Sequence, residues 1–313
     1  MRLRRYVSGV FAIGVLVSFL AFLCADGDRY RRLLHLSSGM VAVLCSLVFF
    51  NIVTNGLSNH VLYKSLGLDV QLSEAIELAA VNSLANHLPF SAGIIAKGVY
   101  LKQRYELAYD RFISATLALY VVFLTTTGLT GVLVLLGRQL LSHNPIPLWL
   151  LLGFALTATS FLALRLPLER LPVPTSWRTR VDRIADGWCT VTSRKWLAPK
   201  LMVLYIVMML TTGGRYWLAF RALSQDVSFS VCVLFAAGSV LTQMVSVVPG
   251  GLGVREGIVA AMAAVMGFGA AVSAVAVALD RLIATLVIVL VGSVSIYLLS
   301  QRALPEQTSL EEL

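Results

Sequence analysis

The sequence has few charged residues and very little cysteine or histidine. Only 13% of its 313 residues are charged, and it contains four cysteines and four histidines. The cysteines (Cys24, Cys45, Cys189 and Cys232) are not spaced as metal ligands, and no His/Cys/Asp/Glu cluster has metal-ligand spacing. There is also no phosphate-binding loop, dinucleotide fingerprint or nucleophile elbow. The sequence therefore predicts no metal, no cofactor and no enzymatic activity.

Apolar residues are abundant instead. The chain is 58% hydrophobic with a mean hydropathy of +0.82, which predicts an all-α polytopic membrane protein rather than a soluble globule. The net charge is +9, and the basic residues lie in short connections between apolar runs. This placement favours membrane lipids with anionic or polar headgroups as partners, and not nucleic acid. We expect one integral membrane domain over residues 1–313.

The chain has enough apolar segments for about six full transmembrane spans. The first could be a signal peptide, but no small-residue cleavage site follows it, so we expect an uncleaved span with a cytoplasmic N-terminus. With six spans the C-terminus is cytoplasmic too, in a multi-pass protein of the bacterial cell inner membrane. The connection 26–32, with three arginines on the expected outer side, fits the positive-inside rule poorly. The spans are expected at about 6–24, 33–53, 112–137, 148–164, 201–222 and 271–300.

A long basic connection at about 165–200 is expected on the cytoplasmic side. Trp177, Val181, Ile184 and Trp188 fall on one face of a helical pattern in it, opposite charged residues. Such a helix would lie in the lipid headgroup layer, or else pack against the helical bundle.

The stretch SVVPGGLGVREG, residues 246–257, interrupts an apolar region with helix-breaking residues. Proline ends an incoming helix and glycines permit sharp turns. A broken helix at membrane depth is tolerated only where protein buries it or where it lines a wet cavity. The N–H groups and positive dipole end of the helix that follows would suit an anion. The residues concerned are Pro249, Gly250, Gly251, Gly253, Arg255 and Glu256.

A similar break occurs earlier in the chain. Asn86, Pro89 and Gly93 have the spacing of Ser246, Pro249 and Gly253, although two unrelated proline breaks would also explain the match. The helix that begins near Glu74 would reach only to about residue 86, too short to cross the membrane. We therefore expect residues 74–97 to form a re-entrant hairpin that enters from the cytoplasm.

Further matches indicate an internal duplication. Residues 69–73 and 226–230 share Asp-Val-x-apolar-Ser, and residues 110–113 and 280–283 share Asp-Arg-x-Ile. These matches occur in the same order as the two breaks, which predicts repeats at about 69–137 and 226–300. An odd number of spans between them makes the repeat inverted, and paired interrupted segments of this kind point to a transporter binding site.

Some ionisable residues fall within or next to apolar runs. Asp110 and Arg111, and likewise Asp280 and Arg281, are candidates for gating pairs or for structural ion pairs that brace the bundle. Arg215 either faces a partner or cavity, or extends to the membrane interface.

Residues 249–257, PGGLGVREG, resemble the most recognisable motif of the membrane region of lysylphosphatidylglycerol synthases and their stand-alone flippase-like relatives. Asn86, Pro89, Gly93 and Lys97 stand where the first-half motif is expected, followed by Tyr100. The resemblance covers about residues 33–300. It implies movement of a polar or anionic lipid, or a lipid-linked headgroup, between leaflets.

In that interpretation Arg255 would meet the headgroup charge, with Lys97 and Asn86 on the opposing hairpin. Glu256 would hold Arg255 in place. The proline and glycine residues of both breaks would shape the backbone of the substrate site.

The chain departs from the family pattern at Phe90, Ser91 and Ile94, where family members commonly carry glycine, basic and acidic residues. The cargo or its coordination is therefore expected to differ. Because no soluble aminoacyl-transferase domain follows, synthase activity is not implied. The alternatives are a non-transporting scaffold for an envelope-lipid or glycan enzyme, and a lipid-modifying enzyme. The second would need a nucleophile or acid/base pair that the sequence does not offer.

Overall fold

The computed structural model describes residues 37–87, 92–142, 146–165, 188–189, 193–240 and 254–302. Over these residues the secondary structure is helical, without strands, and this confirms the all-α prediction. The elements are α3 (Ser38–Ser65), α4 (Leu72–Ala85), α5 (Ala92–Tyr105), α6 (Tyr109–Ser142), α7 (Leu148–Ala158), the 3-10 helix η2 (Thr159–Arg165), α9 (Leu197–Ala222), α10 (Phe229–Val240), α11 (Val254–Val265) and α12 (Ala270–Arg302).

Among the described residues, four helices, α3, α6, α9 and α12, are long and apolar enough to cross a membrane. They correspond to four of the six predicted spans, and they support a multi-pass membrane protein. The predicted span at 6–24 lies outside the described residues. The predicted span at 148–164 is formed by the shorter apolar helix α7 and the 3-10 helix η2.

Two pairs of short helices stand before two of the long ones. Helix α4 ends at Ala85 with Asn86 as its C-cap, which confirms the predicted short helix, and α5 begins at Ala92. Helices α10 and α11 have 12 residues each and precede α12 as α4 and α5 precede α6. The centres of both breaks, residues 88–91 and 241–253, lie outside the described residues.

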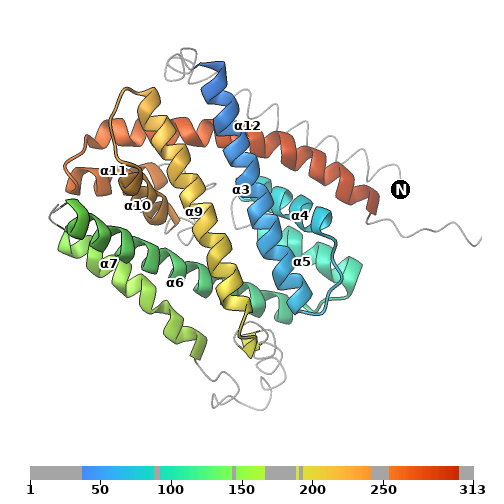
Figure 1. Cartoon of the computed structure of the whole chain (residues 1–313). Coiled ribbons are helices and arrows are strands. Elements are labelled where there is room, and N and C mark those ends of the chain that lie inside the picture. Colours follow the sequence, from blue (N-terminus) through green and yellow to red (C-terminus); the bar gives the residue numbers. More distant parts are fainter. Residues whose placement is uncertain are drawn as a thin grey trace, which may run out of the picture.

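Helices α3 and α9 pack side by side in opposite directions and separate the two short pairs, with α10 and α11 on one side and α4 and α5 on the other (Figure 1). Helix α4 also packs on α12, and α10 packs on α6. In each half of the chain, the first short helix therefore packs against the long helix of the other half.

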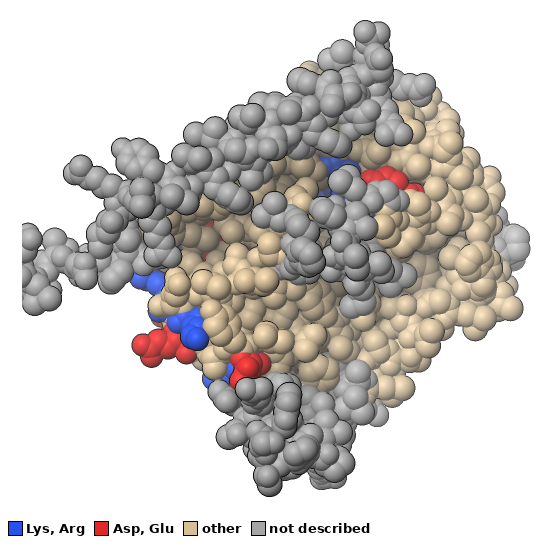
Figure 2. All heavy atoms as spheres, turned by 180° about the vertical axis from the view of Figure 1, so that it is seen from behind, with Lys and Arg blue, Asp and Glu red and all other residues tan. Residues whose placement is uncertain are grey.

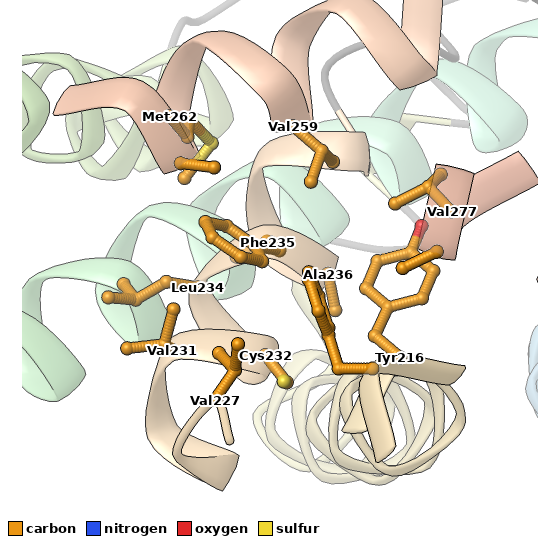
Figure 3. Packing of buried hydrophobic residues seen from close by; sticks show 14 of the residues in the cluster. Tyr216, Val227, Val231, Cys232, Leu234, Phe235, Ala236, Val259, Met262 and Val277 are labelled. Atoms are coloured by element: carbon orange, nitrogen blue, oxygen red, sulfur yellow. The ribbon is translucent and has the colours of Figure 1, made fainter. Parts of the chain in front are cut away.

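Helix α10 is buried over most of its length because it is apolar on every face, as expected of a central helix. Its Phe235 and Ala236 lie among Tyr216 of α9, Val259 of α11 and Val277 of α12 (Figure 3). In a bilayer, helices associate through close packing rather than by removing apolar surface from water.

Small residues bring the helices together. A methyl carbon added at Gly56 of α3 would lie 2.6 Å from the Cα of Ile76, so this glycine allows α3 and α4 to approach closely.

The long polar connection at about 165–200 is mostly outside the described residues, but Trp188 is described and is buried in one core cluster with Leu197 and Leu201. At Trp188 the connection packs against the bundle.

Candidate functional site

A cavity of about 330 Å³ lies between the two halves of the described bundle. It is lined by α3, α4, α5, α6, α9, α11 and α12, and more than half of the lining residues are polar. In contrast, the outer face seen in Figure 2 is mostly uncharged. The polar residues of the lining are Asn51, Asn55, Asn59, Tyr63, Asn82, Ser83, Asn86, His87, Lys97, Thr116, Tyr120, Tyr205, Arg215, Arg255, Arg281 and Thr285.

One of the cavity cations, Arg215, is held by a buried carboxylate. Its Nε donates to Oδ1 of Asp280 at 2.8 Å and its Nη2 donates to Oδ2 at 2.7 Å. The side chains are 7% and 1% exposed. Of the two interpretations left open for Arg215, the structure therefore supports the one with a partner. A bidentate pair of this kind fixes α9 relative to α12.

A second cavity cation, Arg281, is paired with a residue of α11. Its Nη1 lies 2.9 Å from Oε1 and 3.3 Å from Oε2 of Glu256. Asp280 and Arg281 are adjacent in sequence but belong to two different ion pairs, because neighbouring side chains on a helix point in different directions. Glu256 was expected to hold Arg255; the structure shows its carboxylate bonded to Arg281, and the role toward Arg255 stays a prediction.

The remaining two cavity cations, Lys97 and Arg255, form no ion pair within the described part of the chain. Lys97 is 9% exposed, and its Nζ donates to Oδ1 of Asn59 at 3.4 Å. Arg255 is half-buried in the first turn of α11. Buried cations are costly unless a counter-charge or polar groups meet them. The arrangement suits an anionic ligand.

The structure brings Asn86, Lys97, Arg215, Arg255 and Arg281 together around one cavity, although they come from four helices and a helix cap. Glu256 and Asp280 stand behind the lining as partners of two of these cations. The predicted residues Pro89, Pro249, Gly250, Gly251 and Gly253 lie outside the described residues.

Gly93 packs beside the cavity. A methyl carbon added there would lie 2.6 Å from Oδ1 of Asn86 and 2.7 Å from Oδ1 of Asn82, so only glycine allows α5 to begin this close to α4. Asp110 and Arg111 stand in the first turns of α6, half-buried, and are not part of the cavity lining.

The asparagines of α3 are functional candidates that the sequence interpretation missed. Asn51, Asn55 and Asn59 are spaced four residues apart, so they form a polar stripe on one face of an apolar helix. That periodicity is visible in the sequence and was the available signal. Asn82 of α4 faces the same cavity.

A separate polar cluster joins α4, α5 and the end of α12. Glu74 is 3% exposed and accepts hydrogen bonds from the hydroxyls of Tyr100 at 2.6 Å and Tyr105 at 2.7 Å. Glu77 pairs with Arg302 at 3.0 Å. The two tyrosines bond both oxygens of Glu74, and the Glu77–Arg302 pair connects α4 to the end of α12.

A comparison with curated proteins finds no significant match to this chain. A comparison with protein-family models matches residues 9–292 to the lysylphosphatidylglycerol synthase TM region. The match covers nearly all described helices and every cavity residue named above, and it associates the chain with lipid handling in a membrane. The chain belongs to the family of the lysylphosphatidylglycerol synthase transmembrane region, as its motifs indicated.

Proposed function

We propose that this protein binds the polar or anionic headgroup of a membrane lipid in its cavity and moves that lipid between the leaflets of a bacterial inner membrane. The observation that carries the proposal is the placement of Lys97 and Arg255 in the cavity lining without a described carboxylate partner.

The charge of the lining favours an anion. Four cations line the cavity and two of them are paired with carboxylates, which leaves two positive charges in excess among the described residues. A phosphate that entered hydrocarbon without a partner would be opposed by a desolvation cost on the order of tens of kcal/mol. Lys97 and Arg255 would lower that cost by meeting the charge inside the membrane.

The size of the cavity favours a headgroup over a whole lipid. A volume of about 330 Å³ lies at the lower end of small-molecule pockets. The acyl chains would therefore stay in the bilayer while the headgroup passes through the polar site.

The helix order supports an inverted repeat with two re-entrant hairpins. Both halves run short helix, break, short helix and long helix, and each first short helix packs on the long helix of the other half. In the proposed architecture the hairpins enter from opposite sides of the membrane and both termini are cytoplasmic. The cavity between the halves is the arrangement expected of a transporter built from repeats.

The proposal is tested with the purified protein in lipid vesicles that contain phosphatidylglycerol with a fluorescent acyl chain. An impermeant quencher reports how fast labelled lipid leaves the inner leaflet. We expect Lys97→Gln and Arg255→Gln to slow transfer by about tenfold or more, the size of one lost charge-assisted hydrogen bond. Lys64→Gln and Arg221→Gln, which change exposed cations, are the matched controls.

Transfer that survives both cavity substitutions would contradict the site assignment. If the folded protein transfers none of the polar lipids tested, a scaffold for a lipid or glycan enzyme becomes the better explanation. New lipid products after incubation would instead indicate a lipid-modifying enzyme.

A further inference from the structure

The cavity holds acceptor atoms that a phosphate alone would leave unsatisfied. Oδ1 of Asn51 and Oδ1 of Asn82 are buried and accept no hydrogen bond from the described residues. The hydroxyl of Tyr63, which also lines the cavity, is buried and has no described partner. Because a phosphodiester carries acceptors only, these carboxamide oxygens need a ligand group that donates.

A row of carboxamides on α3 begins at the partner of Lys97. Lys97 donates to Asn59, and Nδ2 of Asn59 lies 3.4 Å from Oδ1 of Asn55. One helical turn further, Nδ2 of Asn51 donates to Oγ1 of Thr212 at 3.0 Å, and the Oδ1 atom of the same side chain accepts no hydrogen bond from the described residues. Along α3 the lining thus consists of neutral carboxamides, which both donate and accept.

A positively charged donor does not suit this lining. No Asp or Glu is among the described lining residues. The nearest carboxylates, Asp280 and Glu256, are bonded to Arg215 and Arg281. The sequence places no acidic residue in the two breaks, 88–91 and 241–253. An ammonium group would therefore add charge to a lining that already has an excess of positive charge.

We propose that the cavity selects headgroups in which a phosphate is joined to an uncharged, hydroxyl-bearing unit. The phosphate lies between Lys97 and Arg255, and the hydroxyls donate to the carboxamides of Asn51 and Asn82. This selectivity rests on the proposed binding of a headgroup, and it disfavours the aminoacylated lipid in the family description. It makes the protein a carrier or receptor for anionic polyol or sugar phospholipids.

The test is a direct binding measurement, so that it does not depend on transport. The full-length protein in detergent is offered equal amounts of phosphatidylglycerol, phosphatidic acid and lysylphosphatidylglycerol with the same acyl chains, and bound lipids are counted by native mass spectrometry. We expect phosphatidylglycerol to be retained about two- to tenfold over phosphatidic acid, the range for one neutral hydrogen bond. Lysylphosphatidylglycerol should be retained least.

Single variants show whether the asparagines accept hydrogen bonds from the headgroup hydroxyls. Asn51→Ala and Asn82→Ala should each lower the retention of phosphatidylglycerol more than that of phosphatidic acid, and so reduce the preference between the two lipids. Gln103→Ala, an exposed position on α5, is the matched control. Soluble glycerophosphoglycerol distinguishes a free phosphodiester from a lipid, because effective competition at concentrations near those of the lipid would assign the site to the soluble compound.

Equal or better retention of lysylphosphatidylglycerol overturns the proposal, as does equal retention of the two other lipids by the unmodified protein. Asparagine variants that weaken both anionic lipids alike also overturn it. Selective binding without leaflet transfer would leave this inference intact and refute transport. Leaflet transfer without any headgroup preference in the binding measurement would support transport and overturn this inference.

Discussion

Arg215 of α9 and Asp280 of α12 form a bidentate ion pair, with hydrogen bonds of 2.8 and 2.7 Å, in the interior of a chain that is otherwise strongly apolar. The pair joins a central helix to the last long helix, and its arginine also faces the cavity. The pair therefore connects two long helices at the edge of the candidate site.

Removal of one partner should cost much more than removal of both. We expect Asp280→Asn to destabilise the protein by about 3–5 kcal/mol, because it leaves the Arg215 guanidinium buried without a counter-charge. The double variant Arg215→Met and Asp280→Leu should recover most of the loss. Thermal unfolding in detergent measures this, with the exposed Asp226→Asn as control. Equal melting temperatures for Asp280→Asn and Asp226→Asn would show that the pair contributes nothing.

The second ion pair, between Arg281 and Glu256, sets the charge of the cavity. Glu256→Gln removes one negative charge from behind the lining, so the positive excess rises by one. We expect several-fold tighter binding of phosphatidic acid, with a stronger salt dependence. Glu256→Asp keeps the charge and should change binding little. Weaker binding of phosphatidic acid after Glu256→Gln would indicate that Glu256 acts mainly by positioning Arg281 in the lining.

Gly93 tests the close approach of α5 to α4. A methyl carbon at this position would lie 2.5 Å from the carbonyl oxygen of Asn82, so the start of α5 must move in Gly93→Ala. Overpacking of this kind costs about 1–3 kcal/mol, and lipid retention should fall with it. Gly137→Ala is the control, because nothing lies within 4 Å of the added carbon. A Gly93→Ala protein as stable and as active as Gly137→Ala would contradict the described packing.

Tyr100 and Tyr105, which donate hydrogen bonds to Glu74, should contribute to the free energy of unfolding and not to the preference among lipid headgroups. Tyr100→Phe removes a 2.6 Å hydrogen bond to a buried carboxylate. We expect a loss of about 1.5–3 kcal/mol in thermal unfolding experiments, with unchanged lipid preference in native mass spectrometry. A change in lipid preference would place this cluster within the binding machinery.

Much of the helix pattern could be predicted from the sequence because lipid imposes simple rules on it. Long apolar runs predicted α3, α6, α9 and α12, and the expected end of the helix before Pro89 matches the C-cap at Asn86. The family followed from motif residues in both halves. Each of these features is encoded locally, within one helix or one break.

The contacts of the site could not be predicted in the same way. The partners Arg215 and Asp280 are 65 positions apart, and their pairing depends on how α9 and α12 pack. Asp280 and Arg281 looked like one pair because they are neighbours, but helix geometry directs them to different partners. The four-residue spacing of Asn51, Asn55 and Asn59 is visible in the sequence, but spacing alone does not show whether such a stripe lines a cavity or faces another helix.

The inverted repeat makes a prediction about membrane sidedness. Asp69 and Asp226 begin the matched motifs of the two halves, and both are exposed. If the halves are antiparallel, cysteines placed at these positions must face opposite sides of the membrane. In sealed inside-out vesicles, an impermeant maleimide should therefore label Asp69→Cys and leave Asp226→Cys unlabelled, relative to a parent whose four native cysteines are replaced. Right-side-out vesicles should give the reverse result. Labelling of both positions from one side would mean that the two short helix pairs enter from the same leaflet. The two helix pairs would then not form a site that is reached from both leaflets, and this result would contradict the proposed movement of the headgroup across the membrane.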